Sequence, residues 1–261
     1  MATELTPTRI AAARRSPDRE NDHDIAGAGL DDRPFPPELD LRRGWHDVGD
    51  QGRTSSCVGW AVADSALRWQ LVEAGRLRPA ERLSPRHVWM AAKETDARTA
   101  YPSTFLEEDG TSLKSGLDVV RKFGAVLERE LPWEGRLAVL SPEAFNESAA
   151  GRRIDHYYNL GDDREPDRST FFDDWRRWMH QRGPLLVLLQ VDRHLGEPGP
   201  LLRDFEPVEP PASHAAALLG YGPGYFLLRS SWGTDWGDRG YARMDLDYAA
   251  RAVIESYGIV A

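Results

Sequence analysis

The stretch Asp50-Gln-Gly-Arg-Thr-Ser-Ser-Cys-Val-Gly-Trp-Ala61 holds the only cysteine among 261 residues, Cys57. Hydroxyl side chains directly before it are suitable helix caps, and apolar residues then recur every three or four positions as far as Val72. This pattern predicts a helix that begins near Cys57 and ends at Gly75. Backbone N–H groups at a helix N-terminus favour a thiolate, the nucleophilic form of cysteine. The alternative is a buried thiol used as a small apolar residue.

Two blocks far downstream complete a pattern with this stretch. Gln51 precedes the cysteine by six positions, and the chain later reads Ser213-His-Ala-Ala-Ala-Leu-Leu-Gly-Tyr-Gly222 and Ser231-Trp-Gly-Thr-Asp-Trp-Gly237. In this order the blocks resemble the papain-like (C1) cysteine peptidases, whose pattern runs Gln-Gly, the nucleophilic Cys, a distant His-Ala before Gly-Tyr-Gly, and Asn-Ser-Trp-Gly. The separation of Cys57 from His214 slightly exceeds the roughly 130–150 residues typical of that family. The chain is identified as a bacterial-type member with a single cysteine.

The resemblance implies a role for each matching residue. Cys57 would be the nucleophile and His214 the base beside it, lowering the thiol pKa from about 8.5 to as low as about 3–4. The Gln51 amide and the Cys57 backbone N–H would stabilise the oxyanion. Trp232 would shield the histidine from water and is a candidate substrate-binding residue. The alternatives are a surface turn amide for Gln51 and a core histidine for His214.

Two positions depart from the family pattern. Ser230 stands where these peptidases carry the asparagine that orients the histidine. A serine hydroxyl is shorter and rotates freely, so we expect the imidazole to be held less firmly and catalysis to be reduced rather than absent. Gly110 stands alone where the family has a glycine pair that binds the substrate backbone. It is a candidate substrate-binding residue, and the alternative is a plain turn glycine.

The expected fold class is α+β, with the two-lobed papain-like arrangement that the resemblance implies. Residues 35–261 would form the peptidase domain, with a mainly helical lobe over about 35–137, an antiparallel, barrel-like β lobe over about 138–261, and the cleft between them. Residues 1–34 alternate in charge and contain few large apolar side chains, which favours a flexible arm. This arm is shorter than the family's usual pro-segment, and a cleft-blocking peptide is the alternative.

Composition limits the partners and the compartment. A net charge of −9 without a basic run argues against nucleic acid and anionic membranes as partners. One cysteine permits no internal disulfide, and Thr54 stands where many relatives carry a bridging cysteine, so a cytoplasmic location is expected. The start lacks the apolar core of a signal peptide, and no apolar run is long enough to span a bilayer. The spacing of histidines and acidic residues predicts no metal site, and no cofactor is expected.

The expected activity is that of a cysteine peptidase or peptidase-like amidase, which attacks an amide or ester carbonyl through an acyl-enzyme. Its partner would be a peptide or protein substrate, or a peptide-like metabolite. One alternative is an acyltransferase or peptide ligase that uses the same Cys57–His214 pair. Another is a catalytically weak binding module, although retention of Gln51 with that pair argues against it.

Overall fold

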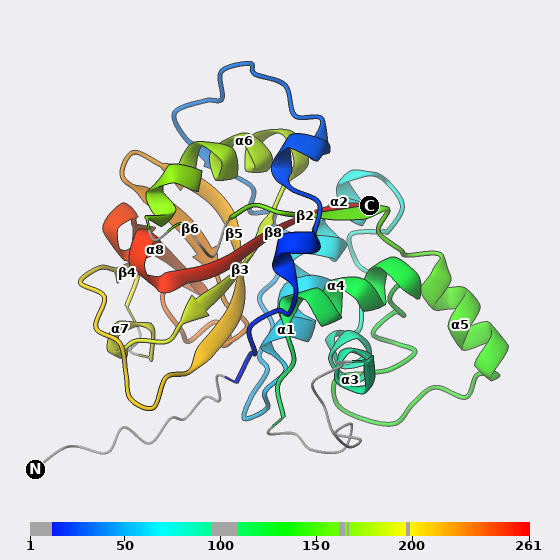
Figure 1. The fold of residues 1–261 in the computed structure, drawn as a ribbon. Coiled ribbons are helices and arrows are strands. Elements are labelled where there is room, and N and C mark those ends of the chain that lie inside the picture. Colours follow the sequence, from blue (N-terminus) through cyan, green and yellow to red (C-terminus); the bar gives the residue numbers. More distant parts are fainter. Residues whose placement is uncertain (1–11, 96–108, 162–164, 166, 197–198) are drawn as a thin grey trace, which may run out of the picture.

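The computed structural model describes residues 12–95, 109–161, 165, 167–196 and 199–261. Its secondary structure falls into two groups that face each other (Figure 1). Helices α1, α3, α4 and α5 lie on one side, and most of a twisted sheet lies on the other, with α6, α7 and α8 around it. This agrees with the predicted α+β class and its two-lobed arrangement.

The helical group is built around the helix that begins at Cys57. This helix comprises α1 (Cys57–Gly59), the π-helical η3 (Trp60–Leu67) and α2 (Arg68–Glu73), so the predicted helix is confirmed. It is followed by α3 (Pro85–Thr95), α4 (Leu113–Lys122) and α5 (Pro142–Ala150). The Ser112 hydroxyl caps α4 by accepting the Ser115 N–H, and Gly124 follows the helix with a φ of 88° that glycine adopts without strain.

The sheet group has the strand order β2-β8-β3-β5-β6-β7-β4, with β1 paired to β5. All of these pairs are antiparallel except β4 with β7. The strands are β1 (Leu39–Asp40), β2 (His156–Asn159), β3 (Leu185–Gln190), β4 (Leu201–Leu202), β5 (Ser213–Gly222), β6 (Tyr225–Arg229), β7 (Tyr241–Asp245) and β8 (Val253–Val260). The described chain also contains the helices η1 (Arg19–Asn21), η2 (Ile25–Ala28), η4 (Arg168–Phe171), α6 (Phe172–Arg182), α7 (Arg193–Gly196) and α8 (Leu246–Ala252).

The core of the sheet group lies between β3, β8 and α6. The apolar run of β3 is buried from Leu185 to Leu189, as expected for a strand covered on both faces. The aromatic stripe of α6 packs against the sheet, and its Trp178 is fully buried. Gly258 on β8 makes room for this ring, because a Cβ there would lie 2.1 Å from the indole. The aromatic side chains of α6, with Phe172, Trp175 and Trp178 all buried, therefore belong to the core of the sheet group.

Residues 12–34 lie against both groups, so the predicted flexible arm is wrong for this part of the chain. The dark blue start of the described chain follows the boundary between the helical group and the sheet (Figure 1). Arg19 donates hydrogen bonds to the Asn159 Oδ1 and the Tyr257 hydroxyl, and Asp22 forms a 2.6 Å ion pair with Lys114. Composition did not predict this ordered structure, because the segment is held mainly by polar groups that are distant in the sequence. The part of the predicted arm at residues 1–11 lies outside the described residues.

Candidate active site

The Cys57 thiol is fully buried at the head of α1, where β5 passes it. Backbone groups of Ala215 on β5 and of Ala12 form hydrogen bonds with the sulfur. Burial raises the pKa of the thiol, and these hydrogen bonds only partly counteract that effect. This direction is opposite to the predicted lowering, because groups of the chain itself, including Ala12, cover the sulfur. Strand β5 nevertheless brings Ala215, the residue next to His214, to the Cys57 sulfur.

His214 lies on β5 between a serine and a tryptophan. Its Nε2 is 3.2 Å from the Ser230 Oγ, and its ring centroid is 4.2 Å from that of Trp232, with 34° between the planes. All three side chains are buried. Ser230 follows the end of β6, so two neighbouring strands place the hydroxyl beside the imidazole. The serine thus contacts the ring at the position where the family pattern has asparagine, and the Trp232 ring packs against the imidazole.

The Gln51 side chain is fully buried, which excludes the surface turn alternative. Its Nε2 donates to the Thr54 carbonyl at 2.6 Å, and its Oε1 accepts from the Ser231 Oγ at 2.7 Å. The Gln51 N–H also donates to the Ser231 carbonyl at 2.8 Å. The amide is therefore held at both ends by fixed neighbours. Sequence reasoning missed the role of Ser231, although its place between Ser230 and Trp232 was a usable signal.

Residues 12–16, here named the cleft segment, connect the two groups of secondary structure across Cys57. The Ala13 N–H donates to the carbonyl of Ser213, next to His214, at 3.0 Å. On the other side, the Arg14 N–H donates to the Thr111 carbonyl at 3.0 Å. Gly110 faces the same segment, because a Cβ there would lie 1.7 Å from the Ala12 carbonyl oxygen. The absence of a side chain at Gly110 therefore leaves room for the backbone of Ala12.

Ser16 anchors the end of the cleft segment. Its backbone N–H and its hydroxyl donate to the two carboxylate oxygens of Glu255 at 2.7 and 2.6 Å. The Lys114 N–H donates in turn to the Ser16 Oγ at 3.2 Å. Glu255 on β8 is buried, and hydrogen bonds to a buried carboxylate are among the stronger ones in proteins. The cleft segment is therefore attached to the sheet and to α4.

The substitution Gly110→Ala is expected to speed labelling of Cys57 by iodoacetamide in the intact chain. The new methyl group takes the space of the Ala12 carbonyl and displaces the cleft segment, which uncovers the sulfur. The measurement is the rate at which the adduct mass appears. Gly44→Ala is the matched control, because a Cβ at Gly44 meets nothing within 4 Å. Equal labelling rates for the two variants would contradict this account of what covers the thiol.

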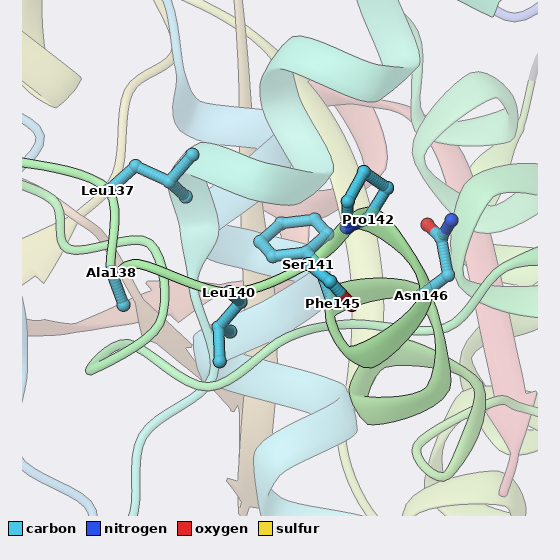
Figure 2. A pocket seen from close by; sticks show the side chains of 7 residues that line it. All are labelled: Leu137, Ala138, Leu140, Ser141, Pro142, Phe145 and Asn146. Carbon is cyan, nitrogen blue, oxygen red and sulfur yellow. The ribbon is translucent and has the colours of Figure 1, made fainter.

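The hollows on the surface of the described chain include one near Gln51 and one at the start of α5. An open hollow of about 430 Å³ adjoins the active site and is lined by Gln51, Gly52, Arg53, Thr54, Arg86, Trp89, Trp133, Glu134 and Gly135. A second, of about 230 Å³, lies at the start of α5 and is lined by Leu137, Ala138, Leu140, Ser141, Pro142, Phe145 and Asn146 (Figure 2). Of these two hollows, the first includes a predicted site residue, Gln51.

Within the described ranges, no three His, Cys, Asp or Glu side chains come together as ligands for a metal ion. No helix in the same part of the chain is both long and apolar enough to cross a membrane.

A cysteine at a helix N-terminus beside a strand that carries a buried histidine is the nucleophile and base arrangement of the cysteine proteases. The family model described as "Papain family cysteine protease" matches residues 35–261. The chain belongs to this family.

Similar proteins agree with the assignment. Papain from Carica papaya is 48% identical over 46 residues, which are 18% of this chain and 12% of papain. Mouse cathepsin F is 35% identical over 75 residues, 24% of this chain and 15% of its own length. The matched parts thus span a small share of these relatives. Among solved structures, xylellain, a cysteine protease from Xylella fastidiosa, matches with a TM-score of 0.74 and 20% identity over 99% of both chains. Digestive procathepsin L 3 of Tenebrio molitor matches with a TM-score of 0.68 and 19% identity, over 98% of this chain and 76% of its own. At these identities the structures show the fold.

Proposed function

We propose that this chain is a bacterial-type cysteine peptidase or peptidase-like amidase with Cys57 as its nucleophile. The observation that carries the proposal is the course of β5, which hydrogen-bonds the Cys57 sulfur at Ala215 and holds His214 against Ser230. Ser230 contacts Nε2 of the ring, so Nδ1 is the nitrogen that we assign to proton exchange with the thiol. The geometry thus supplies a nucleophile, a base and a group that orients the base.

The reaction begins when the Cys57 proton passes to His214. The thiolate attacks the carbonyl carbon of an amide or ester and forms a C–S bond, and the carbonyl oxygen becomes an oxyanion. His214 then gives its proton to the leaving group as the C–N or C–O bond breaks, which leaves an acyl-enzyme. Water, deprotonated by His214, attacks the thioester carbon and forms a C–O bond. The C–S bond then breaks, which releases the product acid, and His214 returns its proton to the sulfur.

Gln51 and the Cys57 backbone N–H are the donors that we assign to the oxyanion. The Gln51 side-chain amide nitrogen is an N–H donor, and it is held by its hydrogen bond to the Thr54 carbonyl at 2.6 Å. The bond from Ser231 fixes the other end of the amide, so the donor is oriented before the reaction begins. Preoriented donors of this kind typically contribute about 3–4 kcal/mol to catalysis.

The substrate class that fits the cleft is an extended peptide or a segment of a protein. The carbonyls of Ser213 and Thr111 accept backbone N–H groups from the cleft segment, and Gly110 allows close approach of a backbone. The same groups would bind an extended substrate in the manner of an added strand. A cytoplasmic location is part of the proposal, because a chain with one cysteine forms no internal disulfide.

Turnover also requires residues 12–16 to leave the cleft. The segment covers the sulfur and uses the backbone groups that a substrate needs, so the described conformation is a closed form. For residues 1–34 the alternative to a flexible arm was a peptide that blocks the cleft, and these contacts favour that alternative. We infer that release of the segment is the step that activates the enzyme.

The test is peptide cleavage by protein whose cleft segment has been cut away, with unfolded protein as substrate and Cys57→Ala as the control. New peptide termini that depend on Cys57 support the peptidase. When small amines are added, a shift from acid to amide products identifies acyl transfer instead. Binding of peptides without either product identifies the binding module and contradicts the proposal.

The substitution Ser230→Asn is expected to raise turnover by about 2- to 10-fold, the worth of one improved hydrogen bond of about 0.5–1.5 kcal/mol. Asparagine is longer and rotates less freely than the hydroxyl, so it holds the His214 ring more firmly. The measurement is kcat for peptide hydrolysis, with Ser230→Ala as the variant that removes the contact and lowers kcat. A lower kcat for Ser230→Asn would show that the site is adapted to serine.

A further inference from the structure

Arg229, the residue directly before Ser230, reaches from the sheet into the helix that carries Cys57. Its guanidinium donates to the Asp64 Oδ2 at 2.7 Å and to the Ser65 Oγ at 2.5 Å. It also donates to the Asp47 carbonyl at 2.7 Å. The Arg229 side chain is 1% exposed and the Asp64 side chain is 0% exposed. This ion pair therefore lies in the interior, where it connects β6 to η3.

Asp64 is the centre of a larger group of charges. Besides Arg229, its carboxylate accepts hydrogen bonds from Arg82 at 3.0 Å and from Arg68 at 3.4 Å. Burial alone would raise the pKa of the Asp64 carboxyl, but the charges of Arg229 and Arg82 hold it well below its usual range. The carboxylate is therefore ionised, and each arginine binds a fixed charge rather than a neutral group.

We propose that Arg229 is a positioning residue for the catalytic site, which fixes Ser230, and through it His214, relative to Cys57. Asp64 and Cys57 belong to one continuous helix, while Ser230 and Arg229 are consecutive residues at the end of β6. The Arg229–Asp64 ion pair therefore sets the distance between the part of the fold that holds the nucleophile and the part that holds the base. This inference rests on the proposed function.

The short side chain of Ser230 makes this placement necessary. Its hydroxyl reaches the His214 Nε2 at 3.2 Å, near the long end of hydrogen-bond distances. If the strand shifted, a longer side chain could keep its hydrogen bond to His214, but the serine hydroxyl would lose it. Beyond the end of β6, the Ser230 N–H is still bonded to the Gly240 carbonyl at 3.1 Å, which fixes it along the sheet. Arg229 supplies the restraint toward the helix.

The test compares Arg229→Lys with Arg68→Lys in protein whose cleft segment has been released, because the closed chain reacts mainly at alkaline pH. Both arginines are at most 2% exposed and both bind Asp64, but Arg68 lies on α2 and has no link to Ser230. Lysine keeps the charge and loses the planar fork. We expect both variants to unfold at lower temperature. Only Arg229→Lys should also slow iodoacetamide labelling of Cys57 on the acid side of the pH profile. The expected decrease in the labelling rate is about 10-fold, because a misplacement of catalytic groups by about 1 Å lowers reaction rates by up to about 100-fold.

A double variant separates positioning from general loosening of the fold. If Arg229 acts through Ser230, then Arg229→Lys has no further effect on labelling in a Ser230→Ala background. Equal losses in the two single variants, or an undiminished loss in that background, would overturn the inference. If the proposed function is wrong, the result is different: the wild-type protein and His214→Ala label at the same rate at every pH.

Discussion

Cutting the chain within its exposed residues 32–34 and removing the released fragment is expected to raise the rate of Cys57 labelling by at least about 100-fold. A tethered segment competes for the cleft at an effective concentration of about 1 mM, and this advantage disappears when the tether is cut and the fragment is removed. The cut is made at a recognition site for a specific protease inserted at this exposed position. The measurement is the rate of adduct formation with iodoacetamide, followed by mass.

Uncut protein with the same insertion is the control, and a synthetic peptide of residues 12–32 should restore slow labelling when it is added back. The pH dependence gives a second readout. Burial raises the pKa of the Cys57 thiol in the closed form, so the intact chain should react mainly at alkaline pH. Release should move the reaction toward acid pH, as an imidazolium neighbour stabilises the thiolate. Labelling that stays slow and alkaline after release would show that the segment does not control the site.

His214→Ala in the released protein is expected to lower peptide hydrolysis by about 100- to 10,000-fold, the usual contribution of a positioned acid–base group. Labelling should fall much less, by about 10-fold at about pH 5.5, because the less basic thiolate of the ion pair is also the weaker nucleophile. The pH profile of labelling should then follow an ordinary thiol with a pKa of about 8.5. The two assays together separate the base function of the ring from its effect on the sulfur.

His87→Ala is the control for loss of a histidine. His87 lies on α3 against Phe145, and burial lowers its pKa to about 4, so it is neutral through the range in which the enzyme is assayed. Its removal should leave the pH profile of labelling unchanged. A loss of hydrolysis with His87→Ala as large as that with His214→Ala would mean that the assay reports folding rather than catalysis.

The sequence was sufficient to predict the helix at Cys57 and to single out His214, Ser230 and Trp232, which lie against one another. Caps and apolar spacing are local signals, and the three motif blocks carry the residues that β5 and β6 bring together. The cleft segment was not predictable in the same way, because its bonds join backbone groups and the Ser16–Glu255 pair, which is 239 positions apart. The direction of the Cys57 pKa shift was missed for the same reason, since it depends on what covers the sulfur.

The burial of Cys57 also has a chemical consequence for an enzyme with one cysteine. A sulfenic acid formed on this sulfur would find no second thiol in the chain with which to condense, so further oxidation to the irreversible sulfinic form would be the nearest outcome. Oxidation begins at exposed thiolates, and the closed chain keeps its sulfur both protonated and out of contact with solvent. The residues that cover the sulfur would therefore also protect it from oxidation.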